Sequence, residues 1–274
     1  MGKLYLGNQE VTPIITKTEA NNQDKTITEN GVYTADEGYT GLGTVTVDVS
    51  SSGEQFIPRE LVDGVLKYPT TKFAWELPDV TKVEINIFKS AFKECSSLTS
   101  VNFPALTTIN DNGFDQACGN CTALTSINFP ALTTVKSGGF RDAFSICSSL
   151  TSINFPALTT VDVQGFYSAF SNCTALTSVN FPALTTLSSN GCMAYCFRYC
   201  SSLTDVYFPA LTTTSFGGNK DQMNGLLNST GTTVTHTLHF PSNLETIISG
   251  LTGYPTFGGT ASAVQILFDL AATS

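Results

Sequence analysis

The sequence contains few charged residues, and basic ones are the scarcest. Charged residues make up 13% of the 274 residues, about half the share of an ordinary soluble domain. There are 13 Lys and Arg against 22 Asp and Glu, and the formal net charge is −9. A protein that neutralises phosphates needs clustered Lys and Arg, and the chain has no basic run. The composition therefore argues against nucleic acid and against an anionic membrane surface as partners.

Long apolar segments are also absent. No stretch approaches 18 consecutive apolar residues, so we expect no transmembrane helix. The opening MGKLYLGNQEVTPIIT has neither an apolar run of signal-peptide length nor a small-residue cleavage site. The sequence predicts a soluble protein without a signal peptide.

Motifs of catalysis are missing as well. The chain has no GxSxG, HExxH, Walker or Rossmann pattern, and its acidic residues fall at different repeat offsets. The only two histidines are His236 and His239, and a spacing of three on a strand places them on opposite faces. We therefore predict no catalytic residue, no metal site and no cofactor, and a protein that binds rather than an enzyme.

The chain does contain an internal repeat of constant length. Five segments align without gaps: SSLTSVNFPALTTI, TALTSINFPALTTV, SSLTSINFPALTTV, TALTSVNFPALTTL and SSLTDVYFPALTTT. Their prolines are Pro104, Pro130, Pro156, Pro182 and Pro209, which are evenly spaced except that the last interval is longer by one position. Looser copies lie around Pro78 and Pro241. Degenerate copies around regular ones are typical of the capping repeats of a solenoid.

Each repeat predicts one coil of the chain. The Leu-x-x-Ile-x-Phe pattern alternates as a short strand with one buried face, and the proline after it ends the strand. Two glycines, Gly138 and Gly139, mark a turn in the second coil. The following GFRDAFSICSSL has apolar residues at roughly helical spacing, which indicates a short helix or a 3-10 turn. In that coil the predicted core residues are Leu124, Ile127, Phe129, Leu132, Val135, Phe140, Ala143 and Phe144.

The coil AFKECSSLTSVNFPALTTI resembles the BspA-like class of bacterial leucine-rich repeats, whose pattern is AFxxCxxLxxIxFPxxLxxI. The resemblance covers about residues 73–216. Cys118 departs from it at the second Phe, and Cys196 at the small-residue position. It implies a leucine-rich-repeat solenoid with adhesion or protein-binding roles, and no enzymatic activity. We expect repeats over residues 84–216 and a capping region over 217–274. Leu98, Leu124, Leu150 and Leu176 should face inward in one continuous column.

The chain before the solenoid has a different composition. Residues 1–49 predict short strands with Gly-rich turns, 50–54 a linker, and 55–83 a cap whose FIPRELVDGVLKY forms a short helix. The segment TITENGVYTADEGYTGLGTVTVDVS resembles a small β module of phage and prophage tail or fibre proteins. That resemblance implies attachment to other virion proteins, or oligomerisation, through residues 1–49.

Five of the eight cysteines share one repeat position and should stack as a buried ladder of free thiols: Cys95, Cys121, Cys147, Cys173 and Cys200. Two alternatives concern the others. Cys118 and Cys121 form a CxxC, which is compatible with redox chemistry or half of a metal site. Cys192, Cys196 and Cys200 share one face if helix persists there, and three thiolates can bind zinc.

Two surfaces are candidate binding sites. The first is the strand face, formed by the outward side chains of the predicted strands: Ser100, Asn102, Ser126, Asn128, Ser152, Asn154, Ser178, Asn180, Asp205 and Tyr207. Its hydroxyls and amides both donate and accept hydrogen bonds, which suits a repetitive partner such as a glycan. The alternative is that they only solvate the sheet. The second surface is the return segment, where we expect exposed and variable residues, among them Asp115, Arg141, Tyr167 and Arg198.

We expect a phage or prophage virion component that contacts a host-surface receptor or glycan. This places the protein in the virion, or in the bacterial cytoplasm before assembly. The alternatives are a BspA-like adhesin on the bacterial cell surface that binds proteins, and a purely structural virion protein.

Overall fold

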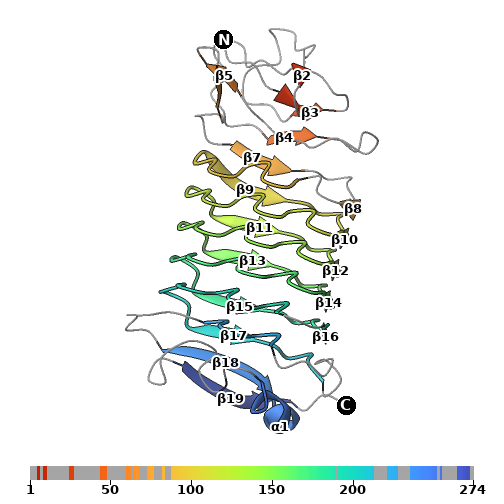
Figure 1. Cartoon of the computed structure of the whole chain (residues 1–274), viewed down its shortest axis with the longest axis vertical. Coiled ribbons are helices and arrows are strands. Elements are labelled where there is room, and N and C mark those ends of the chain that lie inside the picture. The colour runs from red at the N-terminus through yellow and green to blue at the C-terminus, as the bar shows by residue number, and fades with distance from the viewer. Residues whose placement is uncertain are drawn as a thin grey trace.

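The computed structural model describes residues 88–188, 191–212, 221–227, 235–251, 254 and 264–271, together with eight short strands between residues 5 and 83. In this part of the chain successive coils stack along one axis as a parallel β-solenoid (Figure 1). The predicted leucine-rich-repeat architecture is confirmed.

The first strand column takes one strand from each coil. Its strands are β9 (Leu98–Asn102), β11 (Ser126–Asn128), β13 (Ser152–Asn154), β15 (Ser178–Asn180), β17 (Asp205–Tyr207), β18 (His236–Pro241) and β19 (Val264–Leu270). Pairing follows the repeat, so that Ser126 of β11 lies between Ser100 of β9 and Ser152 of β13. Because side chains alternate along a strand, Ile127 points into the core while Ser126 and Asn128 point outward.

A second, shorter strand column follows the proline of each coil, and the sequence did not reveal it. It consists of β8 (Lys82–Val83), β10 (Thr108–Ile109), β12 (Thr134–Val135), β14 (Thr160–Val161) and β16 (Thr186–Leu187). Threonine hydroxyls reinforce this column: Thr133 Oγ1 donates to the Thr107 carbonyl and Thr159 Oγ1 to the Thr133 carbonyl, each at 3.0 Å. This column thus joins the coils from β8 to β16 by hydrogen bonds at a separate edge.

The return segments lie between the second strand of one coil and the first strand of the next, and we define them as residues 88–97, 110–123, 136–149, 162–175 and 191–202. Their hydrogen bonds alternate between two partners. Cys95 N donates to the Phe92 carbonyl three residues back at 2.9 Å, whereas Phe92 N donates to Ala117 of the next coil at 2.7 Å. Of the two predicted alternatives the structure is nearer the 3-10 turn, but every second bond runs between coils and no continuous helix forms.

Three positions in each complete return segment have a positive φ, four residues apart. In one segment they are Asn112, Gln116 and Asn120, with φ of 54°, 56° and 62°. This left-handed conformation favours Gly, Asn and Asp and places other residues under strain. The backbone of the return segment therefore turns at fixed corners, and equivalent corners stack from coil to coil.

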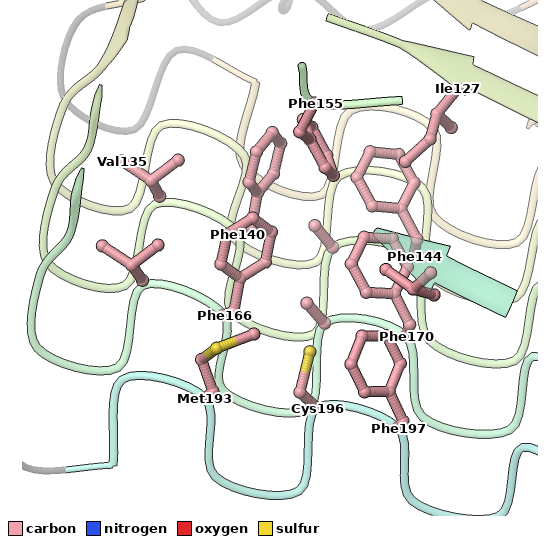
Figure 2. Packing of buried hydrophobic residues seen from close by; sticks show 14 of the residues in the cluster. Ile127, Val135, Phe140, Phe144, Phe155, Phe166, Phe170, Met193, Cys196 and Phe197 are labelled. Carbon is pink, nitrogen blue, oxygen red and sulfur yellow. The ribbon is translucent and has the colours of Figure 1, made fainter. Parts of the chain in front are cut away.

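The core is a set of stacked columns of apolar side chains (Figure 2). In one column the ring of Phe170 lies parallel to those of Phe144 and Phe197, with centroids 5.6 and 5.8 Å apart. In the next, Phe140 stacks on Phe166, and Met193 takes the equivalent place in the following coil. The Leu98, Leu124, Leu150 and Leu176 column is fully buried, as predicted. So are all eight predicted core residues of the second coil, none of which exceeds 2% exposure.

The longest of the five regular coils keeps the first strand column in register. Ser178 pairs with Asp205 of the next coil, although these two residues are one position further apart in the chain than Ser126 and Ser152. In the return segments, Phe140 N donates to the Gly165 carbonyl and Phe166 N to the Cys192 carbonyl, so the second pair is separated by one residue more than the first. Ser188 N still donates to the Val161 carbonyl in the ordinary register, so the additional residue lies between Ser188 and Cys192.

Strands continue the stack toward the N-terminus. β3 (Lys25–Ile27) pairs in parallel with β4 (Thr44–Val47), β4 with β7 (Phe73–Glu76), and β7 with β9. β1 (Tyr5–Leu6) and β2 (Gln9–Glu10) form an antiparallel pair. The remainder of the predicted 1–49 module and the 50–54 linker lie outside the described residues.

The predicted short helix in FIPRELVDGVLKY is wrong. β5 (Glu60–Val62) and β6 (Val65–Lys67) form an antiparallel hairpin there. Between them the sequence has Asp63-Gly64, a dipeptide strongly favoured in two-residue hairpin turns.

At the other end, β18 and β19 extend the first column, and η1 (Ser242–Leu244) and α1 (Glu245–Ile248) lie between them in the chain. Leu244 and Ile248 on these two turns are buried in the core. Among the residues described, no helix has the length and apolar character needed to span a bilayer.

Candidate functional site

The strand face forms two parallel columns of polar side chains. Ser100, Ser126 and Ser152 occupy one column, and pairing continues it from Ser178 to Asp205. The other column consists of Asn102, Asn128, Asn154, Asn180 and Tyr207. Side chains on β9 and β11 are half-buried, whereas those on β13 and β15 are exposed. The accessible part of the strand face is therefore its middle.

The asparagines of this face hydrogen-bond to each other. Asn128 Nδ2 donates to Asn102 Oδ1 at 2.9 Å, and Asn154 Nδ2 donates to Asn128 Oδ1 at 2.8 Å. Such a ladder orders the amides and leaves each with part of its donor and acceptor capacity. The prediction that these residues contact a ligand stays a prediction.

The first strand column is interrupted in the middle of this face. Sheet pairing in the described residues runs from β3 to β13 and again from β15 to β19, with none between β13 and β15. The second column continues across the same coils, since β14 pairs with β16. The exposed Ser152, Asn154, Ser178 and Asn180 thus flank a place where backbone polar groups are not used in a ladder.

Beyond Asn180 the face ends in an aromatic and acidic cluster. The ring of Tyr207 stacks on His239 with centroids 4.2 Å apart. His239 Nε2 lies 3.1 Å from Asp205 Oδ1, and its Nδ1 lies 2.9 Å from Asp269 Oδ2. Hydrogen bonding from Thr204, and next the contact with His239, holds the pKa of Asp205 below its ordinary value. Two anchored carboxylates and one tyrosine therefore form the end of the surface.

The two histidines lie on opposite faces of β18, as predicted. His236 is buried and its Nδ1 contacts the Leu203 carbonyl, whereas His239 pairs with Tyr207 on the outer face. Sequence reasoning missed the His239 cluster because Asp269 lies 30 residues further on, outside the regular repeat.

One return-segment prediction is wrong. Asp115 was expected to be exposed, but its side chain is only 1% exposed and lies between Lys89, at 3.1 Å, and Arg141, at 3.2 Å. These three residues occupy the same offset in successive coils, so stacking brings the two cations to either side of the carboxylate. The bond to Asp115 raises the pKa of Arg141. The sequence carried a signal for these ion pairs, because the charge alternates from Lys89 to Asp115 to Arg141 at one repeat offset.

The other two predicted return-segment residues belong to an aromatic cluster. The rings of Tyr167 and Tyr195 meet edge to face with centroids 5.6 Å apart. The Arg198 guanidinium lies 4.5 Å from the ring centroid of Tyr199 and donates to its hydroxyl at 2.8 Å. Tyr167 and Arg198 are half-buried and packed within this group.

A model of the "BspA type Leucine rich repeat region" matches six copies over residues 78–219, more than half of the chain. The chain belongs to the BspA-type leucine-rich-repeat family. The match does not reach residues 1–49, and so gives no support to the phage module that this segment resembles. No curated protein matches the chain.

Two solved structures are similar to this BspA-type chain. A leucine-rich repeat protein from Bacteroides ovatus is 18% identical, covering 94% of this chain and 76% of its own, with a TM-score of 0.35. A leucine rich cell surface protein from Faecalibacterium prausnitzii is 14% identical, covering 95% of this chain and 92% of its own, with a TM-score of 0.26.

The cysteine of each BspA-type coil is buried and unbridged, as predicted. Its thiol also has a role that sequence reasoning missed. Cys121 Sγ donates to the Phe92 carbonyl at 3.0 Å, and Cys147 Sγ donates to the Cys118 carbonyl at 3.2 Å. Cys173 and Cys200 repeat the contact in later coils. The thiol column thus joins each return segment to the previous one.

The cysteines that depart from the BspA pattern are also buried. Cys118 and Cys196 are both 0% exposed, and burial raises the pKa of each thiol well above its ordinary value. Burial likewise raises the pKa of Cys192 and Cys200 to about 12. Since thiolate is the reactive form, the raised pKa of Cys118 argues against the redox alternative. Among the described residues no three His, Cys, Asp or Glu are placed to hold a metal.

Proposed function

We propose that this protein is a non-enzymatic adhesin of the bacterial cell surface, which binds a protein partner through the strand face. The observation that carries the proposal is the coincidence of three features in one place. The polar side chains of β13 and β15 are exposed, the sheet ladder is interrupted between these strands, and the cluster of Asp205, Tyr207 and His239 lies beside them.

The chemistry of this surface suits a protein partner. Exposed serine and asparagine side chains pair with backbone groups of either polarity. Tyrosine is enriched in protein interfaces because it supplies a large ring and one polar group. No Lys or Arg occurs on the described strands of the first column from β9 to β19, while Asp205 and Asp269 do, which favours a neutral or basic partner.

The absence of enzymatic activity is part of the proposal and rests on the His239 cluster. His239 and its two aspartates are the grouping most similar to an acid–base site among the described residues. Both ring nitrogens already contact a carboxylate, and the ring is only 10% exposed. A general base must reach the proton it removes, and this imidazole has no nitrogen directed at a substrate.

Attachment to a virion through residues 1–49 is the alternative, supported only by the sequence resemblance of that segment. Membership of the BspA-type family supports the adhesin. The adhesin and virion hypotheses differ in where the native protein is found. Labelling of the protein on intact cells supports the adhesin, and its recovery only in particles released by lysis contradicts the adhesin.

The binding surface is tested with the full chain on an array of immobilised host extracellular-matrix proteins and glycans. Ser178→Arg places a long cation in the middle of the strand face, and we expect it to weaken binding at least tenfold. The matched control is Thr174→Arg, an exposed position on a return segment. Equal binding by both variants, or loss only with the control, refutes the assignment of the strand face.

A further inference from the structure

The return segments of three consecutive coils enclose a groove of about 310 Å³, which we call the return groove. It is lined by Lys93, Glu94, Gln116, Gly119, Asn120, Asp142, Ser145 and Ile146. It shares no residue with the strand face. Its volume lies at the lower end of the range of small-molecule sites.

The groove follows from the corners of the return segments. Glu94, Asn120 and Ile146 occupy equivalent positive-φ corners in successive coils and line the groove. Gln116 and Asp142, at the preceding corner, line it as well. Gly119 also lines the groove and has no side chain to fill it.

Ile146 is unusual at its corner. The equivalent residues before and after it are Asn120 and Asn172, the residue type that tolerates a positive φ. A β-branched side chain at φ 60° costs on the order of 1–2 kcal/mol. Burial does not offset this cost, because Ile146 is 47% exposed and is one of two exposed large apolar side chains described. An exposed and strained apolar residue in a polar groove points to contact with a ligand.

The polar lining selects against anionic ligands. It contains two carboxylates, Glu94 and Asp142, and one ammonium group, Lys93, which already donates to Gln116 Oε1 at 2.7 Å. Burial, followed by the neighbouring Asp115, raises the pKa of Asp142. A phosphate or carboxylate ligand therefore meets net negative charge in this groove.

We propose that the return groove binds one or two residues of a neutral glycan. Sugar hydroxyls donate and accept at once, which matches a lining of carboxylate, amide, hydroxyl and ammonium groups. Ile146 supplies an apolar surface for the C–H face of a pyranose ring. An extended peptide is a poorer match, because the groove spans only three coils and ends at Lys93 and Gln116.

The test uses the full chain and saturation-transfer NMR with neutral trisaccharides of glucose, galactose, mannose and N-acetylglucosamine. Trigalacturonate and a tetraglycine peptide serve as acidic and peptide probes. We expect binding of at least one neutral trisaccharide and of neither other probe. Binding of none of the neutral sugars, or of only the acidic sugar or the peptide, overturns the proposal.

Two variants assign the binding to the groove. A Cβ at Gly119 lies 3.4 Å from Ser145 Oγ, an ordinary contact, so Gly119→Gln fills the groove without displacing backbone. Ile146→Asn removes the apolar contact with the ligand and relieves the backbone strain of a β-branched residue at positive φ. We expect both to reduce affinity at least tenfold while the melting temperature of Ile146→Asn rises.

Thr174→Gln, at an exposed position outside the groove, is the control and should bind as the unchanged chain does. If Gly119→Gln keeps full affinity while folded, the groove is not the site. The strand-face variant Ser178→Arg should retain sugar binding, so failure of the proposed adhesin function and of this groove are distinguishable.

Discussion

Leu150→Ala tests whether the coils share one packed core. Leu150 is fully buried in the middle of the leucine column, with Leu124 and Leu176 in the neighbouring coils. Removing three carbon atoms from water-free surroundings loses about 2.4 kcal/mol, at about 0.8 kcal/mol for each methylene. The second strand column holds this coil to both neighbours, through β12 and β16, so that they cannot collapse onto the site. A residual cavity of about 60 Å³ then adds about 1.4 kcal/mol. We expect a loss of about 4 kcal/mol in the free energy of unfolding.

The assay is urea-induced unfolding followed by circular dichroism and by intrinsic fluorescence, since coincident curves support a two-state analysis. Ser152→Ala, two residues away on the exposed face, is the matched control and should change stability by less than about 0.5 kcal/mol. A loss below about 1 kcal/mol for Leu150→Ala refutes the reasoning, because it means that this side chain is not packed between coils.

Three further predictions concern the return segments. Asp115→Asn should lower stability by about 1–3 kcal/mol in thermal unfolding, because it removes the buried negative charge that pairs with Lys89 and Arg141; an unchanged melting temperature contradicts that role. Asp142→Asn should stabilise the protein at pH 7 and not at pH 3. The pKa of the Asp142 carboxyl is higher in the folded state than in the unfolded state, so its ionisation destabilises the fold. This destabilisation develops as pH rises through the unfolded-state pKa toward the folded-state pKa. A stability gain that is the same at both pH values argues against a titrating carboxyl. The buried thiol of Cys147, whose pKa is well above its ordinary value, should react with a disulfide reagent at pH 8 only at the rate of unfolding; rapid labelling of the folded chain contradicts its burial.

The repeat made the solenoid and its core predictable. When the same offset recurs in every coil, stacking brings equivalent side chains together whatever the path of the coil between them. Leu98, Leu124 and Leu150 could thus be assigned to one column without knowledge of the return segment. The outward direction of Ser126 and Asn128 followed from alternation along a strand.

The features that were missed lack a local signal. The second strand of each coil, as in Thr134–Val135, has two residues and therefore no alternation to detect. Corners with positive φ are occupied by Gln116 and Ile146, whose types do not favour that conformation, so the groove they border could not be seen in the sequence. The ion pairs of Asp115 required comparison of charges across coils rather than along the chain.

The extra residue between Ser188 and Cys192 has a consequence for how such chains change length. There the longest regular coil holds one residue more than its neighbours, yet Ser178 still pairs with Asp205 of the next coil and Phe197 still stacks on Phe170. One added residue at this point of the coil leaves the alignment of adjoining turns intact. The equivalent point of other coils is therefore a natural grafting point, where gene rearrangement or protein engineering can lengthen a coil without remaking the interior.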